Sequence, residues 1–219
     1  MPLDPHQRPP LMCLTQDGLP WSHIEQATRL CAAGARWIQL RMKGAKQAEW
    51  LATARKVVAV CHAHHAICIV NDSVDIAIAS GADGVHLGKL DLDWHQARNR
   101  LGPTHLLGGT VNNPADAGRA HVARCLDYVG VGPLRFTATK EKLAPVLSLD
   151  GVRAAITRLD GLPAWVIGGV KADDLPDLHA AGASGAAVSA ALFREGRIEQ
   201  NFAALLAAWP TSPSHAFPQ

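Results

Sequence analysis

Short apolar runs of strand length alternate with helix-length segments along almost the whole chain, and this alternation constrains the fold more than any other feature. It is clearest between residues 67 and 91, where two apolar runs end in the carboxylates Asp72 and Asp91. The segment Ser73–Gly81 between them has the length and spacing of one short helix, with Ile76 and Ala77 on its buried side. A βαβ unit of this kind places two strands in parallel, with their carboxyl ends on one face.

The rest of the chain repeats this unit, so that eight strands are expected, each followed by a helix. Besides the two strands above, the expected strands cover residues 11–15, 37–42, 106–111, 128–131, 164–167 and 186–188. The expected helices cover residues 22–33, 48–63, 73–81, 92–101, 114–124, 149–158, 172–180 and 198–208. The strands show little polar alternation, which is typical of a parallel sheet covered on its outer face. The prediction is an α/β protein with a single domain over residues 1–219, a (β/α)8 TIM barrel ordered over about residues 11–208 with loose ends.

A doubly wound open sheet is the alternative architecture. It would place a G-x-G-x-x-G turn after the first strand, and the sequence has none there. A net charge of +2 without a basic block gives no nucleic-acid footprint, and no apolar run is long enough to span a bilayer. The first ten residues lack the apolar core of a signal peptide, and the five cysteines form no C-x-x-C. We therefore expect a soluble cytoplasmic protein with reduced, mostly buried thiols.

The active site of a barrel lies at the carboxyl ends of its strands, so those ends can be searched for chemistry. Asn71 and Asp72 end the third strand, and Asp91 follows the fourth. Neighbouring strands lie roughly 5 Å apart, so the two carboxylates should approach closely and repel each other unless a cation lies between them. Magnesium takes one or two carboxylates and completes its shell with substrate phosphates, so we expect Mg²⁺ as the cofactor at this pair.

The second strand ends in the run from Gln39 to Lys43, and alternation places Gln39, Arg41 and Lys43 on one side of the chain. Two cations and an amide beside the carboxylate pair suit a magnesium-bound diphosphate. In the plainer alternative, Arg41 and Lys43 simply pair with the two aspartates. That alternative leaves the amides Gln39 and Asn71 unexplained.

Further strand ends carry anion-binding signals. After the sixth strand, Thr137, Thr139 and Lys140 form a strip of hydroxyl and ammonium donors. The seventh strand ends in Gly168-Gly169 and the eighth in Val188-Ser189. Loops at these two positions are a recurrent phosphate site of barrels, where glycine lets backbone N–H groups approach the oxygens.

Taken together, these residues resemble the thiamine-phosphate synthase (thiamine phosphate pyrophosphorylase) family over roughly residues 11–208. The motifs that carry the resemblance are Gln39-x-Arg41-x-Lys43, Asn71-Asp72, the run from Gly81 to Asp91, the run from Val129 to Pro133, Thr137-x-Thr139-Lys140 and Gly168-Gly169-Val170. Each motif alone is weak, but six in this order at the strand ends are specific. The resemblance implies a transferase of thiamine biosynthesis that joins 4-amino-2-methyl-5-hydroxymethylpyrimidine diphosphate to 4-methyl-5-(2-phosphoethyl)thiazole, giving thiamine phosphate and diphosphate. It also implies magnesium on Asp72 and Asp91.

That reaction needs no activated nucleophile in the protein, and the sequence shows none. An electron-rich aminopyrimidine expels diphosphate and leaves a stabilised cation, which the thiazole nitrogen captures, so the protein supplies charge and alignment. Arg41, Lys43 and Lys140 are the expected catalytic cations. The other expected substrate-binding residues are Gln39, Asn71, Thr110, Thr137, Thr139, Gly169, Val188 and Ser189.

The chain departs from the family pattern at several positions. Thr110 stands in place of an expected serine, Asn112 of a frequent histidine, Lys89 of a glutamine and Phe136 of a proline. These departures concern substrate contacts more than the reaction class. Two other functions on the same barrel stay open: a thiazole tautomerase, which would not need the diphosphate cations, and a non-enzymatic ligand sensor, which should lack some of them. The sequence indicates small-molecule substrates as partners and gives no oligomeric state.

Overall fold

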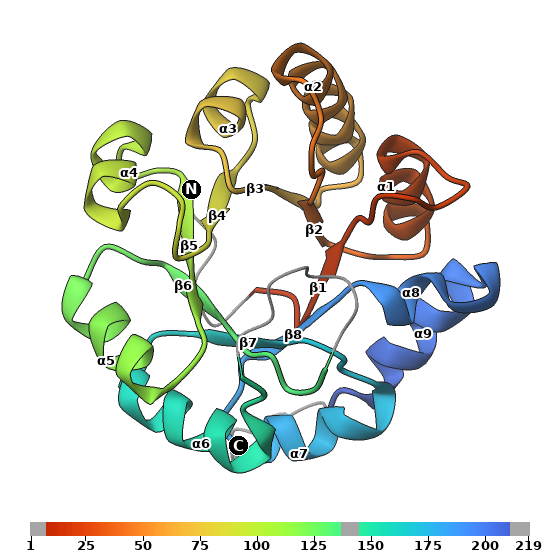
Figure 1. Cartoon of the computed structure of the whole chain (residues 1–219). Coiled ribbons are helices and arrows are strands. Elements are labelled where there is room, and N and C mark those ends of the chain that lie inside the picture. Colours follow the sequence, from red (N-terminus) through yellow and green to blue (C-terminus); the bar gives the residue numbers. More distant parts are fainter. Residues whose placement is uncertain (1–7, 137–144, 211–219) are drawn as a thin grey trace, which may run out of the picture.

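The computed structural model describes residues 8–136 and 145–210, in which eight parallel strands close into one barrel inside a ring of helices (Figure 1). Each strand pairs with the next in sequence, and β8 pairs with β1 to close the ring. The strands are β1 (Leu11–Leu14), β2 (Trp37–Leu40), β3 (Ile67–Asn71), β4 (Gly84–Leu87), β5 (Leu106–Val111), β6 (Tyr128–Val131), β7 (Ala164–Ile167) and β8 (Gly185–Val188). The predicted (β/α)8 TIM barrel is confirmed.

The helices lie outside the strands and cover the barrel on all sides (Figure 1). They are α1 (His23–Ala32), α2 (Gln47–Ala63), α3 (Val74–Ser80), α4 (Trp94–Leu101), α5 (Pro114–Ala123), α6 (Ser148–Leu159), α7 (Leu175–Ala180), α8 (Ala190–Phe193) and α9 (Ile198–Ala208), with short 3-10 turns at Ala172–Asp174 and Arg194–Gly196. Helix α8 was not expected, because four residues are too few to show a helical period.

Strand β2 ends at Leu40, two residues earlier than the sequence predicts. The reason lies in where the next N–H groups donate. The N–H groups of Arg41 and Lys43 bond to side chains of the loop after β1 rather than to a neighbouring strand. This early departure from the sheet places both residues at the barrel mouth.

The inner core fills the barrel with side chains from alternate strand positions, and its widest members are Trp37, Tyr128 and Trp165. These three rings meet edge to face, with centroids 4.7–5.9 Å apart. Gly108 and Gly185 make room for them, since a Cβ at either position would lie 2.2 Å from a ring atom. Bulky rings therefore fill the inside of the barrel below the mouth.

An outer core lies between the strands and the helices and takes the other strand positions, such as Ile38, Leu40 and Val70. The cysteines are free thiols, as expected: Cys13, Cys31, Cys61 and Cys68 are buried and Cys125 is half-buried. No helix in residues 8–136 and 145–210 is long and apolar enough to cross a bilayer.

Candidate active site

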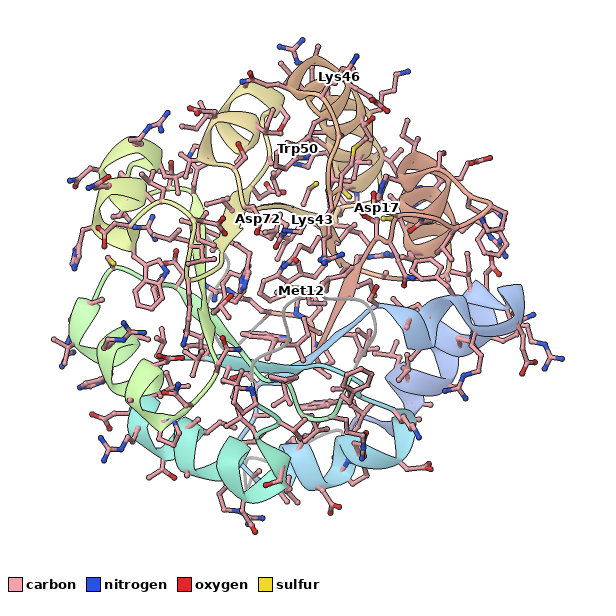
Figure 2. The ribbon with its side chains drawn as sticks, in the orientation of Figure 1. Met12, Asp17, Lys43, Lys46, Trp50 and Asp72 are labelled. Carbon is pink, nitrogen blue, oxygen red and sulfur yellow. The ribbon has the colours of Figure 1, made fainter. Side chains whose placement is uncertain are left out.

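A cavity of about 950 Å³ opens at the carboxyl ends of the strands, and all eight strands contribute to its lining. The predicted site residues that line it are Gln39, Arg41, Lys43, Asn71, Asp72, Thr110, Gly169, Val188 and Ser189. Asp17, Lys43 and Asp72 gather over neighbouring strand ends, while Met12 lies nearer to the centre of the ring (Figure 2). Three predicted residues lie outside the described part of the chain, namely Thr137, Thr139 and Lys140.

Asp72 follows β3 in an unusual backbone conformation. Its φ of 70° lies in the left-handed region, which aspartate adopts more readily than most residues but at a cost in free energy. The Asp72 N–H donates to the His86 carbonyl at 2.8 Å, so β4 holds the turn. The carboxylate lines the cavity and forms an ion pair with Lys43. A strained backbone under a cavity-lining carboxylate points to a functional residue.

Asp91 is half-buried near Asp72, and its carboxylate accepts a hydrogen bond from the Gly88 N–H at 2.6 Å. Burial raises the pKa of Asp91; the Gly88 N–H opposes this rise, and the neighbouring Asp72 carboxylate adds to it. Gly88 lines the cavity, whereas Asp91 itself does not. The two aspartates therefore interact, as their positions after adjacent strands predict.

The residues present fit a magnesium site that is completed by substrate. Repulsion between two carboxylates is relieved by a shared cation. Within residues 8–136 and 145–210, no group of three or more histidine, cysteine, aspartate or glutamate side chains could hold a metal ion by itself. Two carboxylates are what Mg²⁺ takes from a protein when phosphate oxygens supply further ligands. The plainer alternative of simple ion pairing is met in part: Lys43 pairs with Asp72, but the described residues offer Asp91 no ion pair.

Two of the residues that depart from the family pattern have clear structural partners. Lys89 pairs with the buried Asp116 in the first turn of α5 and does not line the cavity. Burial alone would raise the pKa of Asp116, but Lys89, the Asn112 N–H and Arg119 together lower it. The Asn112 side chain lines the cavity and donates to the Gly132 carbonyl at 2.5 Å, which joins the ends of β5 and β6.

His86 and Thr110 meet inside the cavity. His86 Nε2 lies 3.1 Å from Thr110 Oγ1, and both residues belong to the lining. Gly130 on the far side of β5 leaves space for the imidazole, because a Cβ there would lie 3.2 Å from its Cε1 atom. The hydroxyl that replaces the expected serine is therefore present and held beside a histidine.

The opposite side of the mouth is built mainly from backbone. Gly168 and Gly169 follow β7 with φ values of 97° and 70°, which glycine adopts without steric cost. A Cβ on Gly169 would lie only 3.0 Å from the Cβ of Arg135. The Arg135 guanidinium donates to the Gly169 carbonyl at 3.0 Å and pairs with Asp174 through both of its terminal nitrogens. This ion pair anchors the glycine turn.

The loop after β1 also contributes to the site, and the sequence patterns did not indicate it. Gln16 and Asp17 line the cavity, and they reach both sides of it. The Ser189 hydroxyl donates to Gln16 Oε1 at 3.3 Å, and the Lys43 N–H donates to Asp17 Oδ2 at 3.1 Å. The signal in the sequence is a pair of polar residues directly after the first apolar run, a position like that of the other site residues after their strands.

Comparisons with known proteins agree on one family. The family model described as thiamine monophosphate synthase matches residues 11–192. A thiamine-phosphate synthase of Bacteroides fragilis is 38% identical over 188 residues, which cover 84% of this chain and 92% of that protein. One from Myxococcus xanthus is 42% identical over 189 residues, covering 85% and 86%. Among solved structures, a thiamine phosphate pyrophosphorylase from Pyrococcus furiosus matches with a TM-score of 0.81 and 26% identity, covering 90% of this chain and 94% of that one.

Proposed function

The chain belongs to the thiamine monophosphate synthase family, and we propose that its barrel mouth divides between the two substrates of that reaction. The enzyme is a transferase of thiamine biosynthesis that joins the hydroxymethylpyrimidine diphosphate to the thiazole phosphate and releases diphosphate. In our proposal, the diphosphate binds over β2–β4 and the thiazole phosphate binds over β7 and β8. We further propose that the enzyme works in the cytoplasm on these small molecules.

Charge supports the placement of the diphosphate. Arg41 and Lys43 supply two cations on the β2 side, and Asp72 and Asp91 are the residues that would hold Mg²⁺. When bound, magnesium would neutralise diphosphate oxygens and so favour departure of the leaving group. Lys140 is assigned the same task as the two cations on the strength of its sequence position alone. The proposal thus gathers positive charge where negative charge develops.

The chemistry of the step explains the absence of a nucleophile from the proposed roles. The bond between the pyrimidine methylene carbon and the diphosphate oxygen breaks, and its electron pair leaves with diphosphate. The lone pair of the thiazole nitrogen then forms the new carbon–nitrogen bond, and no proton has to be removed. Gln39 and Asn71 are both buried in the cavity wall, and in our proposal they hold the polar edge of the pyrimidine. Holding both rings in line is the second contribution of the protein.

Backbone geometry supports the placement of the thiazole phosphate. Gly169 and the β8 end, Val188 and Ser189, line the cavity across from the charged side. Loops after the seventh and eighth strands of barrels recurrently bind phosphate. Thr110 lines the cavity as well and presents a hydroxyl to a bound substrate.

One observation carries the proposal: Asp72 and the two cations that follow β2 share a single cavity with a glycine turn, and Asp91 interacts with Asp72. The test is an assay with both substrates and Mg²⁺, in which mass spectrometry identifies thiamine phosphate and a coupled assay follows diphosphate. Omission of either substrate, or addition of a chelator, should abolish product. Conversion of a thiazole isomer without the pyrimidine would instead indicate a tautomerase, and binding without turnover would indicate a sensor.

A further inference from the structure

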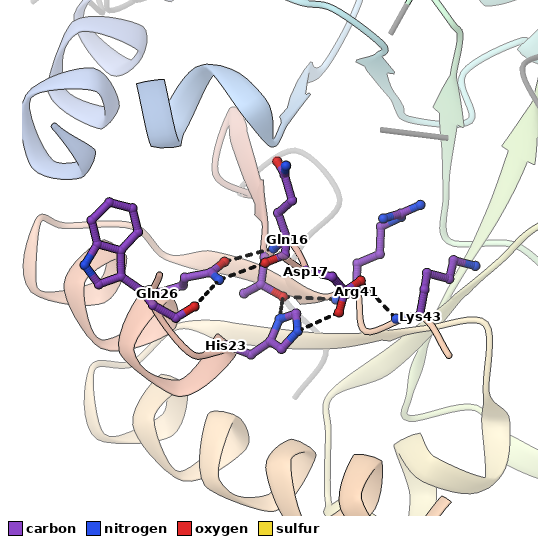
Figure 3. A network of polar contacts seen from close by, with 8 residues as sticks. Gln16, Asp17, His23, Gln26, Arg41 and Lys43 are labelled. Carbon is purple, nitrogen blue, oxygen red and sulfur yellow. Dashed lines mark hydrogen bonds and ion pairs between the residues drawn. The ribbon is translucent and has the colours of Figure 1, made fainter. Parts of the chain in front are cut away.

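Arg41 and Lys43, the proposed diphosphate-binding cations, belong to a segment that has left the barrel sheet. A backbone hydrogen bond joins Thr15 N–H to the Gln39 carbonyl at 3.0 Å. Beyond it, the Arg41 N–H donates to Thr15 Oγ1 and the Lys43 N–H donates to Asp17 Oδ2, each at 3.1 Å. Two side chains of the loop after β1 therefore replace the sheet ladder at residues 41–43 (Figure 3).

His23, the first residue of α1, connects these two side chains. Its Nδ1 lies 2.8 Å from Thr15 Oγ1, and its Nε2 lies 3.0 Å from Asp17 Oδ1. A carboxylate only accepts, so the Nε2 hydrogen is donated to Asp17. In the neutral imidazole, Nδ1 then accepts from the Thr15 hydroxyl, whose oxygen remains free to accept from the Arg41 N–H. Each donor meets an acceptor along an unbroken chain of hydrogen bonds from Arg41 to Lys43.

Thr15 and His23, the inner members of this chain of hydrogen bonds, are buried, and α1 holds the loop that carries Thr15. Thr15 is fully buried, and His23 is only 9% exposed. The buried Gln26 accepts from the Gln16 N–H at 2.8 Å and donates to the Gln16 carbonyl at 2.9 Å, as a neighbouring strand would (Figure 3). A capping box fixes the start of α1, which carries both His23 and Gln26. The loop after β1 is therefore a rigid support for whatever bonds to it.

We propose that Thr15, His23 and Asp17 are positioning residues, which hold Arg41 and Lys43 in place for the diphosphate of the pyrimidine substrate. The inference rests on the proposed function, because it takes Arg41 and Lys43 as diphosphate ligands. Long cationic side chains lose much rotamer entropy when they are fixed. A backbone that is already fixed lowers the total entropic cost of ordering these residues when the substrate binds. Cations placed before the reaction also stabilise the departing charge without reorganisation.

The kinetic test uses Thr15→Val and Asp17→Ala, with Thr28→Val and Asp150→Ala as matched controls on exposed positions of α1 and α6. Loss of the hydrogen bond to either N–H should raise KM for the pyrimidine diphosphate and lower kcat/KM about tenfold. KM for the thiazole phosphate should change by less than about twofold, since the other half of the mouth is untouched. Both controls should match the wild type. An equal rise of both KM values in Thr15→Val and Asp17→Ala would overturn the inference.

Two further variants separate positioning from general loosening of the fold. Asp17→Asn keeps one carbonyl oxygen for the Lys43 N–H, so it should recover part of the activity that Asp17→Ala loses. The double variant of Thr15→Val and Asp17→Ala should lose less than the product of the single losses, because His23 couples the two bonds. No recovery in Asp17→Asn together with fully additive losses would contradict a connected chain.

Direct binding of inorganic diphosphate with Mg²⁺, measured by calorimetry, separates this inference from the proposed function. The affinity should fall about tenfold in Asp17→Ala and Thr15→Val and stay unchanged in Asp150→Ala. A wild type that binds diphosphate but makes no thiamine phosphate would contradict the proposed function alone. Wild-type diphosphate affinity in both variants would overturn the positioning role alone. A wild type that does not bind diphosphate at all would contradict both. If Asp17→Ala fails to fold, the nearly isosteric Thr15→Val decides the outcome.

Discussion

The two halves of the barrel mouth are built from different materials. Over β2–β4, the charged side chains Lys43, Asp72 and Asp91 define the site, and side chains of the loop after β1 support it. Over β7 and β8, the site consists of a glycine turn and the Ser189 hydroxyl. Arg135 lies beside this turn, but its guanidinium is already paired with Asp174. One half therefore offers charge, and the other offers shape and backbone groups.

The difference matches what happens to each substrate in the proposed reaction. Diphosphate gains charge as its bond to carbon breaks, so fixed cations stabilise the transition state more than the ground state. The phosphate of the thiazole keeps its charge throughout and needs only to be held, which backbone N–H groups can do. The charged half should therefore control kcat, and the glycine half should control KM for the thiazole. Single substitutions can break this contrast.

Removal of either proposed magnesium ligand should have the largest effect. Asp72→Asn and Asp91→Asn should each lower kcat by about 10³-fold or more with the fold intact, because the diphosphate loses its cation. Magnesium should bind the wild type measurably only when diphosphate is present, since two carboxylates alone form a poor magnesium site. Diphosphate release and calorimetry check the two statements, with Asp150→Asn as the exposed control. Near-normal turnover in both variants would place the metal elsewhere.

Loss of Lys140 should come next in size. Lys140→Ala should lower kcat about 10²-fold and change KM little, the pattern expected when one preorganised charge donor is removed. This prediction rests on the Thr137-x-Thr139-Lys140 motif, because these residues lie outside the described part of the chain. Lys56→Ala on the exposed side of α2 is the matched control. Normal kcat in Lys140→Ala would leave Arg41 and Lys43 as the working cations.

The sequence could predict the charged half of the mouth far better than its support. Lys43 and Asp72 carry their chemistry in their own side chains, and both follow the carboxyl ends of neighbouring strands, which open into one cavity. The role of His23 could not be predicted, because its partners depend on where β2 leaves the sheet and on which N–H groups become available. The contact of Lys89 could not be predicted either, because the packing of α5 decides whether Lys89 faces the cavity or pairs with Asp116. Sequence patterns locate functional groups, whereas the bonds that orient them are properties of the folded backbone.

Blocking the glycine turn should raise one Michaelis constant selectively. Gly169→Val should increase KM for the thiazole phosphate about tenfold, because valine disfavours a φ of 70° and its Cβ would crowd Arg135. kcat and KM for the pyrimidine should change little. Gly161→Val is a matched control, since Gly161 has a φ of 89° with open space around it, in the loop that leads into β7. It should lower the melting temperature and leave both KM values unchanged. A fall in kcat without a change in KM for Gly169→Val would erase the contrast between the halves.

The smallest expected effect concerns the ion pair that anchors the glycine turn. Burial alone would raise the pKa of Asp174, but Arg135 and the Lys171 N–H lower it on balance. Because the pKa of Asp174 is lower in the folded protein, its carboxylate stabilises the fold at pH values above the usual aspartate pKa of about 4. This stabilisation disappears as the pH falls through the lowered pKa. Asp174→Asn should therefore lower the free energy of unfolding, measured by urea titration at pH 7, by about 1 kcal/mol. The loss is modest because the Arg135 side chain is 44% exposed. The difference from the wild type should persist to about pH 5 and shrink toward pH 3.

KM for the thiazole phosphate should rise a few-fold at pH 7, since the turn loses its anchor, while Asp150→Asn, in an exposed pair with Arg153, should show neither change. A stability difference that is the same at pH 3 as at pH 7 would show that the ionised carboxylate is not what holds the turn.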